Sequence, residues 1–191
     1  MDALSNRNKT KTMKTLFTLS VLTLLSAAVF AQSPGGVSSG LVVWLKPDAS
    51  GMAPGADGSA VPTWNDASGL GHNATQASAA ARPLYYSNQF NGHAAIRTSS
   101  TRFFNIDLSD INDTNYTIIT VSKRLGSVGY VVGYSGATSS TGLALGYAGS
   151  TLARHSQYAN WVNMTIPAND PASELPVILA CQFDELVGKR A

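Results

Sequence analysis

The segment Tyr116-Thr117-Ile118-Ile119-Thr120-Val121-Ser122 decides the fold class of this chain. Its central residues, threonine, isoleucine and valine, are all β-branched, and such side chains favour extended backbone over helix. Apolar and β-branched residues occupy both alternating faces of the segment. The pattern therefore predicts a β-strand in the middle of a layered sheet, covered on each side.

The segments that follow it toward the C-terminus also predict strands. Two hairpins are expected, because short apolar segments flank polar turns; their strands are 130–134 with 142–147, and 152–157 with 161–166. Residues 176–183 alternate apolar and polar, which predicts a strand with one buried face that includes Cys181. Because Cys181 is the only cysteine, no intrachain disulfide can form, and we expect a buried small apolar residue.

Toward the N-terminus the pattern is similar but weaker. The apolar run 41–46 predicts a buried strand, and 61–64 predicts a short edge strand because it contains a proline. Residues 84–86 and 94–97 predict two strands that are joined through the turn dipeptide Asn91-Gly92. Many short strands at a spacing of about 8–12 residues are typical of a β-sandwich.

The first 31 residues have the order of a secretory signal peptide. Basic residues precede the apolar run 16–30, and the small residue Ala31 precedes the polar turn that starts at Gln32. The run is shorter than the roughly 20 residues of a membrane-spanning helix. We therefore expect a signal peptide at 1–31, a linker at 32–40, one domain at 41–191, and secretion or display at the cell surface. An uncleaved membrane anchor is the alternative.

Charge and length restrict the class of partner. Four of the 13 basic residues and one of the 11 acidic residues lie before Gln32, so the mature chain has a slight net negative charge. Without a basic patch, nucleic acid is not an expected partner, and no membrane span is expected in the mature chain. The remaining length suits a single domain.

Two segments carry a family resemblance. They are PGGVSSGLVVWLKPDA at 34–49 and TWNDASGLGHNATQ at 63–76, the latter followed by Arg82-Pro83. Together they resemble the opening of concanavalin A-like lectin/glucanase (laminin G-like) domains of secreted bacterial surface proteins. The segments 116–124 and 176–190 fit the same pattern. This chain has Leu70 and His72 where the family usually has asparagine.

The resemblance implies a jelly-roll sandwich of two antiparallel sheets. It also implies that the closing strands of the family, after about Arg190, are missing, so that the domain is truncated at its C-terminus. The expected function is non-catalytic binding or adhesion, with a glycan or another surface polymer as partner. A spacer domain of a larger surface protein and a fragment of a glycan-cleaving enzyme are the alternatives.

The loop from Asn65 to Asn73 is the most distinctive local motif. Asp66 and Ser68 can accept hydrogen bonds from nearby backbone N–H groups, and Gly69 and Gly71 permit positive φ angles. The motif is therefore interpreted as a self-supporting turn.

Calcium binding is the alternative for this loop. Asp66 and Asn65, with Asp48 from the preceding loop, carry the hard oxygen ligands that calcium prefers. No cofactor is required by any other motif, so calcium is the single candidate ion.

Exposed aromatic rings are the candidate sugar-binding groups, because sugars stack their C–H faces on such rings. Trp44 lies in an apolar run and is expected in the core, whereas Trp161, beside Tyr158, is the better surface candidate. Packing of Trp161 in the core or at a sheet edge is the alternative. Trp64 adjoins Asn65 and Asp66 and completes the set of candidate ligand-binding residues.

Catalytic carboxylates are not evident. Glycoside hydrolysis needs two carboxyl groups facing each other across the bond. Glu174 and Glu185 are the only glutamates, and Asp184 and Glu185 would point to opposite faces of a strand. The histidines His72, His93 and His155 lack metal-ligand spacing. The sequence thus favours a binding protein over an enzyme.

Overall fold

The computed structural model describes residues 33–37, 39–48, 55–112, 114–126, 128–133, 142–157, 160–166, 175–184 and 188–190. The chain divides into two compact units, Met1–Leu41 and Val42–Ala191. In the first unit the described residues include the 3-10 turn η1 (Pro34–Gly36). The predicted signal peptide lies outside the described residues. Among the described segments, no helix has the length and apolar character needed to cross a membrane.

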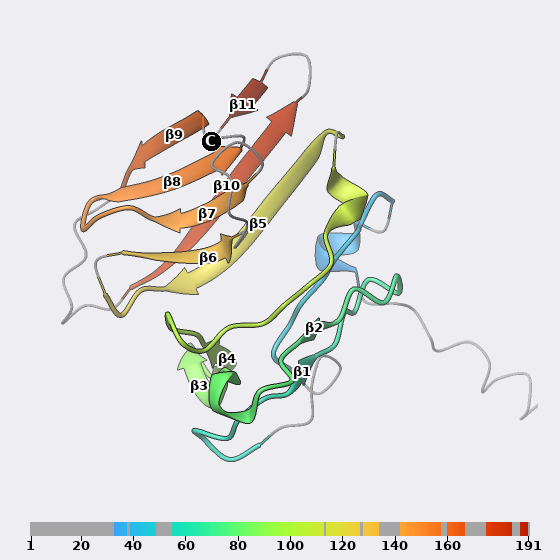
Figure 1. Ribbon diagram of the computed structural model, residues 1–191, viewed down its shortest axis with the longest axis vertical. Helices are drawn as coiled ribbons and strands as arrows, with labels where there is room; N and C mark the ends of the chain where they lie inside the picture. Colours follow the sequence, from blue (N-terminus) through green and yellow to red (C-terminus); the bar gives the residue numbers. More distant parts are fainter. Residues whose placement is uncertain are drawn as a thin grey trace, which may run out of the picture. The chain divides into compact units, whose positions relative to one another are not determined.

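The second unit consists mainly of β-strands, which confirms the predicted all-β class (Figure 1). Its described helical segments are two 3-10 turns, η2 (Ala79–Ala81) and η3 (Ser109–Ile111). The strands are β1 (Thr63–Trp64), β2 (Ala74–Thr75), β3 (Leu84–Phe90), β4 (His93–Arg97), β5 (Tyr116–Lys123), β6 (Gly129–Gly133), β7 (Leu143–Tyr147), β8 (Leu152–Gln157), β9 (Asn160–Thr165), β10 (Pro176–Asp184) and β11 (Gly188–Arg190).

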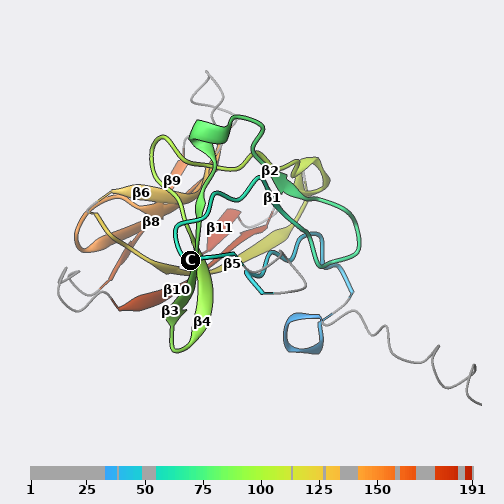
Figure 2. The ribbon, with the colours of Figure 1, turned by 90° about the horizontal axis from the view of Figure 1, so that it is seen from below.

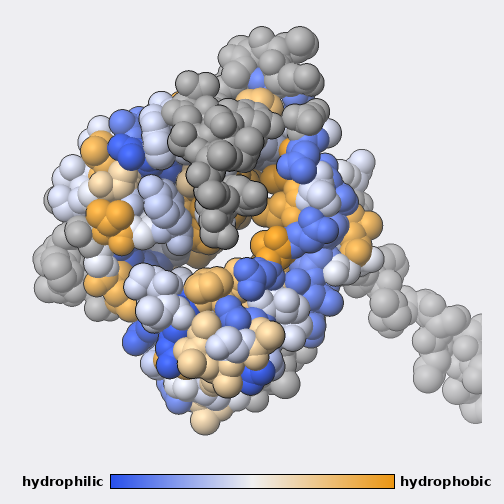
Figure 3. Space-filling view, in the orientation of Figure 1, coloured by the Kyte–Doolittle hydropathy of each residue, from blue (hydrophilic) through white to orange (hydrophobic). Residues whose placement is uncertain are grey.

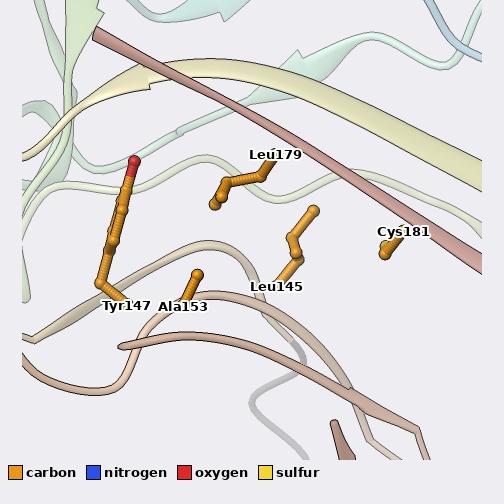
Figure 4. Close-up of a cluster of buried hydrophobic side chains, with 5 residues drawn as sticks. All are labelled: Leu145, Tyr147, Ala153, Leu179 and Cys181. Carbon is orange, nitrogen blue, oxygen red and sulfur yellow. The ribbon is translucent and has the colours of Figure 1, made fainter. Parts of the chain in front are cut away.

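The C-terminal strands form two antiparallel sheets with a shared core. One sheet has the order β11-β10-β5 and the other β6-β7-β8-β9. Figure 4 shows the core side chains that meet between them: Leu145 and Tyr147 of β7, Ala153 of β8, and Leu179 and Cys181 of β10. The predicted hairpins, the alternation in β10 and the burial of Cys181 are therefore confirmed.

Polar contacts also join these two sheets. The hydroxyl groups of Ser122 on β5 and Tyr147 on β7 lie 2.6 Å apart. The buried Arg124, just after β5, donates from its two Nη atoms to the carbonyl oxygens of Gly149 and Ser150. These bonds hold the turn between β7 and β8 against the end of β5.

Strand β5 corrects the prediction of a strand covered on both faces. Among the described residues it has a hydrogen-bonded neighbour on one side only, and it lies at one end of its sheet. Tyr116 is buried and Ile118 packs on the core, whereas Ile119 is 68% and Val121 61% exposed. Both faces carry apolar side chains, but among the described residues only those of the inner face pack on the core.

A close backbone approach distinguishes the β6–β7 pair. The register shifts between Tyr130 and Val132, as expected of a β-bulge. A Cβ atom on Gly146 of β7 would lie 2.6 Å from the Cα atom of Tyr130 and would also meet the carbonyl oxygen of Gly129. The absence of a side chain at residue 146 is therefore a condition for this pairing.

The N-terminal part of the second unit contains the β3–β4 hairpin, also seen in Figure 2. Its turn residues Asn91 and Gly92 both have positive φ, at 50° and 88°. Such angles at both positions are those of a type I′ turn, which matches the twist of the paired strands. The predicted hairpin is confirmed.

The segment 41–46 corrects a second prediction. Among the described residues it is not part of a β-strand, and its backbone forms an isolated bridge between Leu45 and Asp66. All six residues are only half-buried, Trp44 included, so the expected core position of Trp44 is also wrong. Apolar composition favours extended backbone, but a sheet also needs a neighbouring strand that forms hydrogen bonds with it.

Candidate functional site

The Asn65–Asn73 loop is organised around the carboxylate of Asp66. Oδ1 accepts hydrogen bonds from the backbone N–H of Trp44 at 2.8 Å and of Ser68 at 2.9 Å. Oδ2 accepts from the Ser68 hydroxyl at 2.5 Å and from the backbone N–H of His72 at 3.1 Å. One side chain thus joins the start of the unit to both ends of the loop.

The rest of the loop supports the same arrangement. The backbone N–H of Asp66 donates to Oδ1 of Asn73 at 2.8 Å, and that of Leu70 donates to the Ser68 hydroxyl at 3.2 Å. Gly69 and Gly71 have φ angles of 94° and 86°, where a Cβ atom would strain the backbone. These contacts match the predicted self-supporting turn.

The ionisation of Asp66 follows from these contacts. Partial burial by itself raises the pKa of the carboxyl group, but the hydrogen bonds from Ser68, Trp44 and His72 together lower it below its usual value. Donors stabilise the charged form, so the loop is built for the carboxylate.

The same contacts disfavour calcium at Asp66. A carboxylate offers about four lone-pair positions, and protein donors use all four here. Asp48 is exposed and lies 3.5 Å from the ammonium group of Lys46. Within the described parts of the chain, no group of three or more His, Cys, Asp or Glu side chains is arranged to hold a metal ion. Calcium at Asp48 and Asp66 stays a prediction that the geometry does not favour.

Trp64 and Asn65 are neighbours in the sequence but have different surroundings in the structure. The indole N–H of Trp64 donates to the carbonyl oxygen of Lys46 at 2.8 Å, and its ring contacts that of Phe104. Trp64 also packs against the small cluster formed by Val61 and Tyr85. Its polar and apolar groups are thus both engaged within the unit, whereas the adjacent Asn65 is exposed.

Trp161 is the best-placed candidate for ligand contact. It is 54% exposed, on the face of the β6–β9 sheet opposite the core, which we call the outer face. The guanidinium carbon of Arg154 lies 4.6 Å from the centre of the Trp161 ring. Nε of Arg154 donates to Oδ1 of Asn163 at 2.9 Å. We call Arg154, Trp161 and Asn163 the outer-face cluster.

Strand register explains why these three residues meet. Arg154 pairs with Asn163, and Ser156 with Trp161, across the β8–β9 ladder. Ala153 and His155 are buried, so Arg154 between them points to the outer face. Arg154 and Asn163 were not among the predicted site residues. The expected hairpin of 152–157 with 161–166 placed the two strands side by side, but it did not give the register that pairs Arg154 with Asn163.

On the face drawn in Figure 3, hydrophobic and hydrophilic described residues are mixed. The outer-face cluster is recognised from its contacts. Tyr158, Glu174 and Glu185, all considered from the sequence, lie outside the described residues.

Two histidines make contacts that connect different segments of the fold. His155 is fully buried, with its ring edge-on to that of Tyr116 at a centroid distance of 6.4 Å. Nε2 of His72 lies 3.1 Å from Oδ2 of Asp110, which links the Asp66 loop to η3. Both contacts tie parts of the fold together.

Comparison with known proteins adds no further assignment: no family model, curated protein or solved structure matches this chain. The geometry of its own residues is therefore the basis for a functional proposal.

Proposed function

We propose that the chain is a secreted, non-catalytic module that binds carbohydrate or a related surface polymer. In this proposal the two packed sheets belong to a jelly-roll sandwich of the concanavalin A-like kind, and the first 31 residues are a signal peptide. The supporting observation is the exposed ring of Trp161, held by Arg154 on the outer face of β8 and β9. A flat ring on a rigid sheet offers a sugar an apolar surface at low entropic cost.

The test is binding of the purified protein to a panel of soluble polysaccharides, compared with its Trp161→Ala variant. We expect the wild type to bind at least one polymer and the variant to lose that binding. Trp64→Phe is the matched control, because Trp64 is engaged inside the unit. Equal binding by wild type and Trp161→Ala would remove the support for this site.

A second candidate function is a spacer domain in a larger surface protein. It is favoured by the exposed apolar side chains of β5 and β10 on the side of their sheet that faces away from the core. Val121 pairs with Ile178, and the latter is 70% exposed. A spacer would show no binding to any polymer and no effect of Trp161→Ala.

A further inference from the structure

We propose that the outer-face cluster recognises an anionic sugar: a carboxylate or sulfate group binds the guanidinium of Arg154 while the sugar ring packs against Trp161. This inference rests on the proposed function and names the class of polymer for the same site. The two sources of negative charge, uronate and sulfate ester, share the chemistry that Arg154 offers.

The guanidinium of Arg154 is held in place before any ligand arrives. Its Cζ lies over the Trp161 ring at 4.6 Å from the ring centre, and its Nε donates to Oδ1 of Asn163 at 2.9 Å. A planar fork that is already oriented loses little rotamer freedom when it binds an oxyanion. The geometry therefore favours bidentate binding of a group with two or more oxygen atoms.

The positive charge of Arg154 is not compensated within the described residues. The ion pairs there join Lys46 to Asp48 and His72 to Asp110, and neither includes Arg154. Its Nη atoms make no hydrogen bond in the described part of the chain, since its one bond uses Nε. As far as the described segments extend, both Nη atoms are thus available for a ligand.

Other arginines of the fold are used differently. Arg124 also lies over an aromatic ring, that of Tyr147, but its Nη atoms donate to two carbonyl oxygens and it is buried. Arg102 donates from Nη1 to the carbonyl oxygen of Arg82. Arg154 differs because, among the described residues, its hydrogen bonding is limited to Nε, and the ring that it lies over is exposed.

Arg97 provides a matched control. Its guanidinium carbon lies 4.2 Å from the centre of the Tyr86 ring on the β3–β4 hairpin. In the described residues it has no hydrogen bond comparable to that between Arg154 and Asn163. Arg97→Gln therefore removes an equal charge and a similar contact with an aromatic ring, at a residue outside the outer-face cluster.

The experiment measures affinity for two pairs of polymers with the purified protein. Polygalacturonate is compared with its methyl ester, and dextran sulfate with dextran, for the wild type, Arg154→Gln, Arg154→Lys, Arg97→Gln and Trp161→Ala. We expect the wild type to bind at least one anionic polymer about tenfold or more tightly than its neutral counterpart. The pair that shows the difference identifies carboxylate or sulfate.

Arg154→Gln should remove this preference, and Arg154→Lys should restore little of it because an ammonium group lacks the fork. Arg97→Gln should keep it. Melting temperatures of the variants close to that of the wild type show that the sheet is intact.

The remaining outcomes overturn the inference in different ways. If Arg97→Gln and Arg154→Gln reduce the preference for the anionic polymer equally, the preference reflects unspecific attraction between charges. Equal affinity for charged and neutral polymers, lost only in Trp161→Ala, would reject the anionic class while the proposed function stands. Binding to no polymer of this set or of the wider panel would reject both.

Discussion

Replacing Asp66 by alanine tests the structural role of the Asn65–Asn73 loop. The substitution removes four hydrogen bonds, with donors at the backbone N–H of Trp44, Ser68 and His72 and at the Ser68 hydroxyl. A hydrogen bond contributes about 0.5–1.5 kcal/mol to stability. The loop is half-exposed, so water can satisfy part of the freed donors. We therefore expect a loss near the lower end, about 2–3 kcal/mol in total.

The assay is thermal and urea unfolding of wild type and Asp66→Ala, each in calcium and in chelator. For a domain of this size the loss corresponds to a shift in melting temperature of about 2–4 °C per kcal/mol. The melting temperature of Asp66→Asn should lie between those of the wild type and Asp66→Ala. The amide oxygen of asparagine can replace Oδ1, but its amide nitrogen cannot accept hydrogen bonds. We expect the shift to be the same with and without calcium.

Acid should weaken the same contacts. The pKa of Asp66 is lowered in the folded state, so its contribution is present above the ordinary carboxyl pKa of about 3.9 and is lost as the pH falls through the folded value. The difference in unfolding free energy between the wild type and Asp66→Ala should therefore become smaller at low pH.

Two results would refute this account of the loop. A loss below about 0.5 kcal/mol would mean that the four bonds are replaced by water at no net cost. A calcium-dependent stabilisation of the wild type that is absent in Asp66→Ala would establish the metal site instead, since a ligand that binds only the folded state raises its stability.

Three further predictions follow from single positions. Gly146→Ala should destabilise the protein by about 1–3 kcal/mol through overpacking against β6, whereas Gly149→Ala, where a Cβ atom meets nothing within 4 Å, should be close to neutral in urea unfolding. Burial raises the pKa of the Cys181 thiol to about 11, so iodoacetamide at neutral pH should label it only after unfolding; rapid labelling of the folded protein would contradict its buried position. If residues 1–31 are a signal peptide, as proposed, N-terminal sequencing of the exported protein should give Gln32 as its first residue, and an exported product that retains the apolar run would disprove cleavage.

Much of the all-β character could be read from local patterns. The alternation in β10 and the Asn91-Gly92 turn depend on residues close in sequence, and both were predicted. The Asp66 loop was also recognised as a turn, because Asx and glycine chemistry acts over a few residues. The reach of Asp66 to the backbone of Trp44, 22 residues away, was not predicted.

Local sequence patterns are enough to place most strands and turns, because period-2 alternation and turn chemistry act over a few residues. The packing of the folded chain determines which faces are covered: Ile118 and Ile119 have the same side chain, but Ile118 packs against the core and Ile119 is exposed. It also decided that Arg154 meets Trp161 and Asn163, since that cluster depends on the register of β8 against β9. Register and packing are set by contacts between distant segments, and no short stretch of sequence contains them.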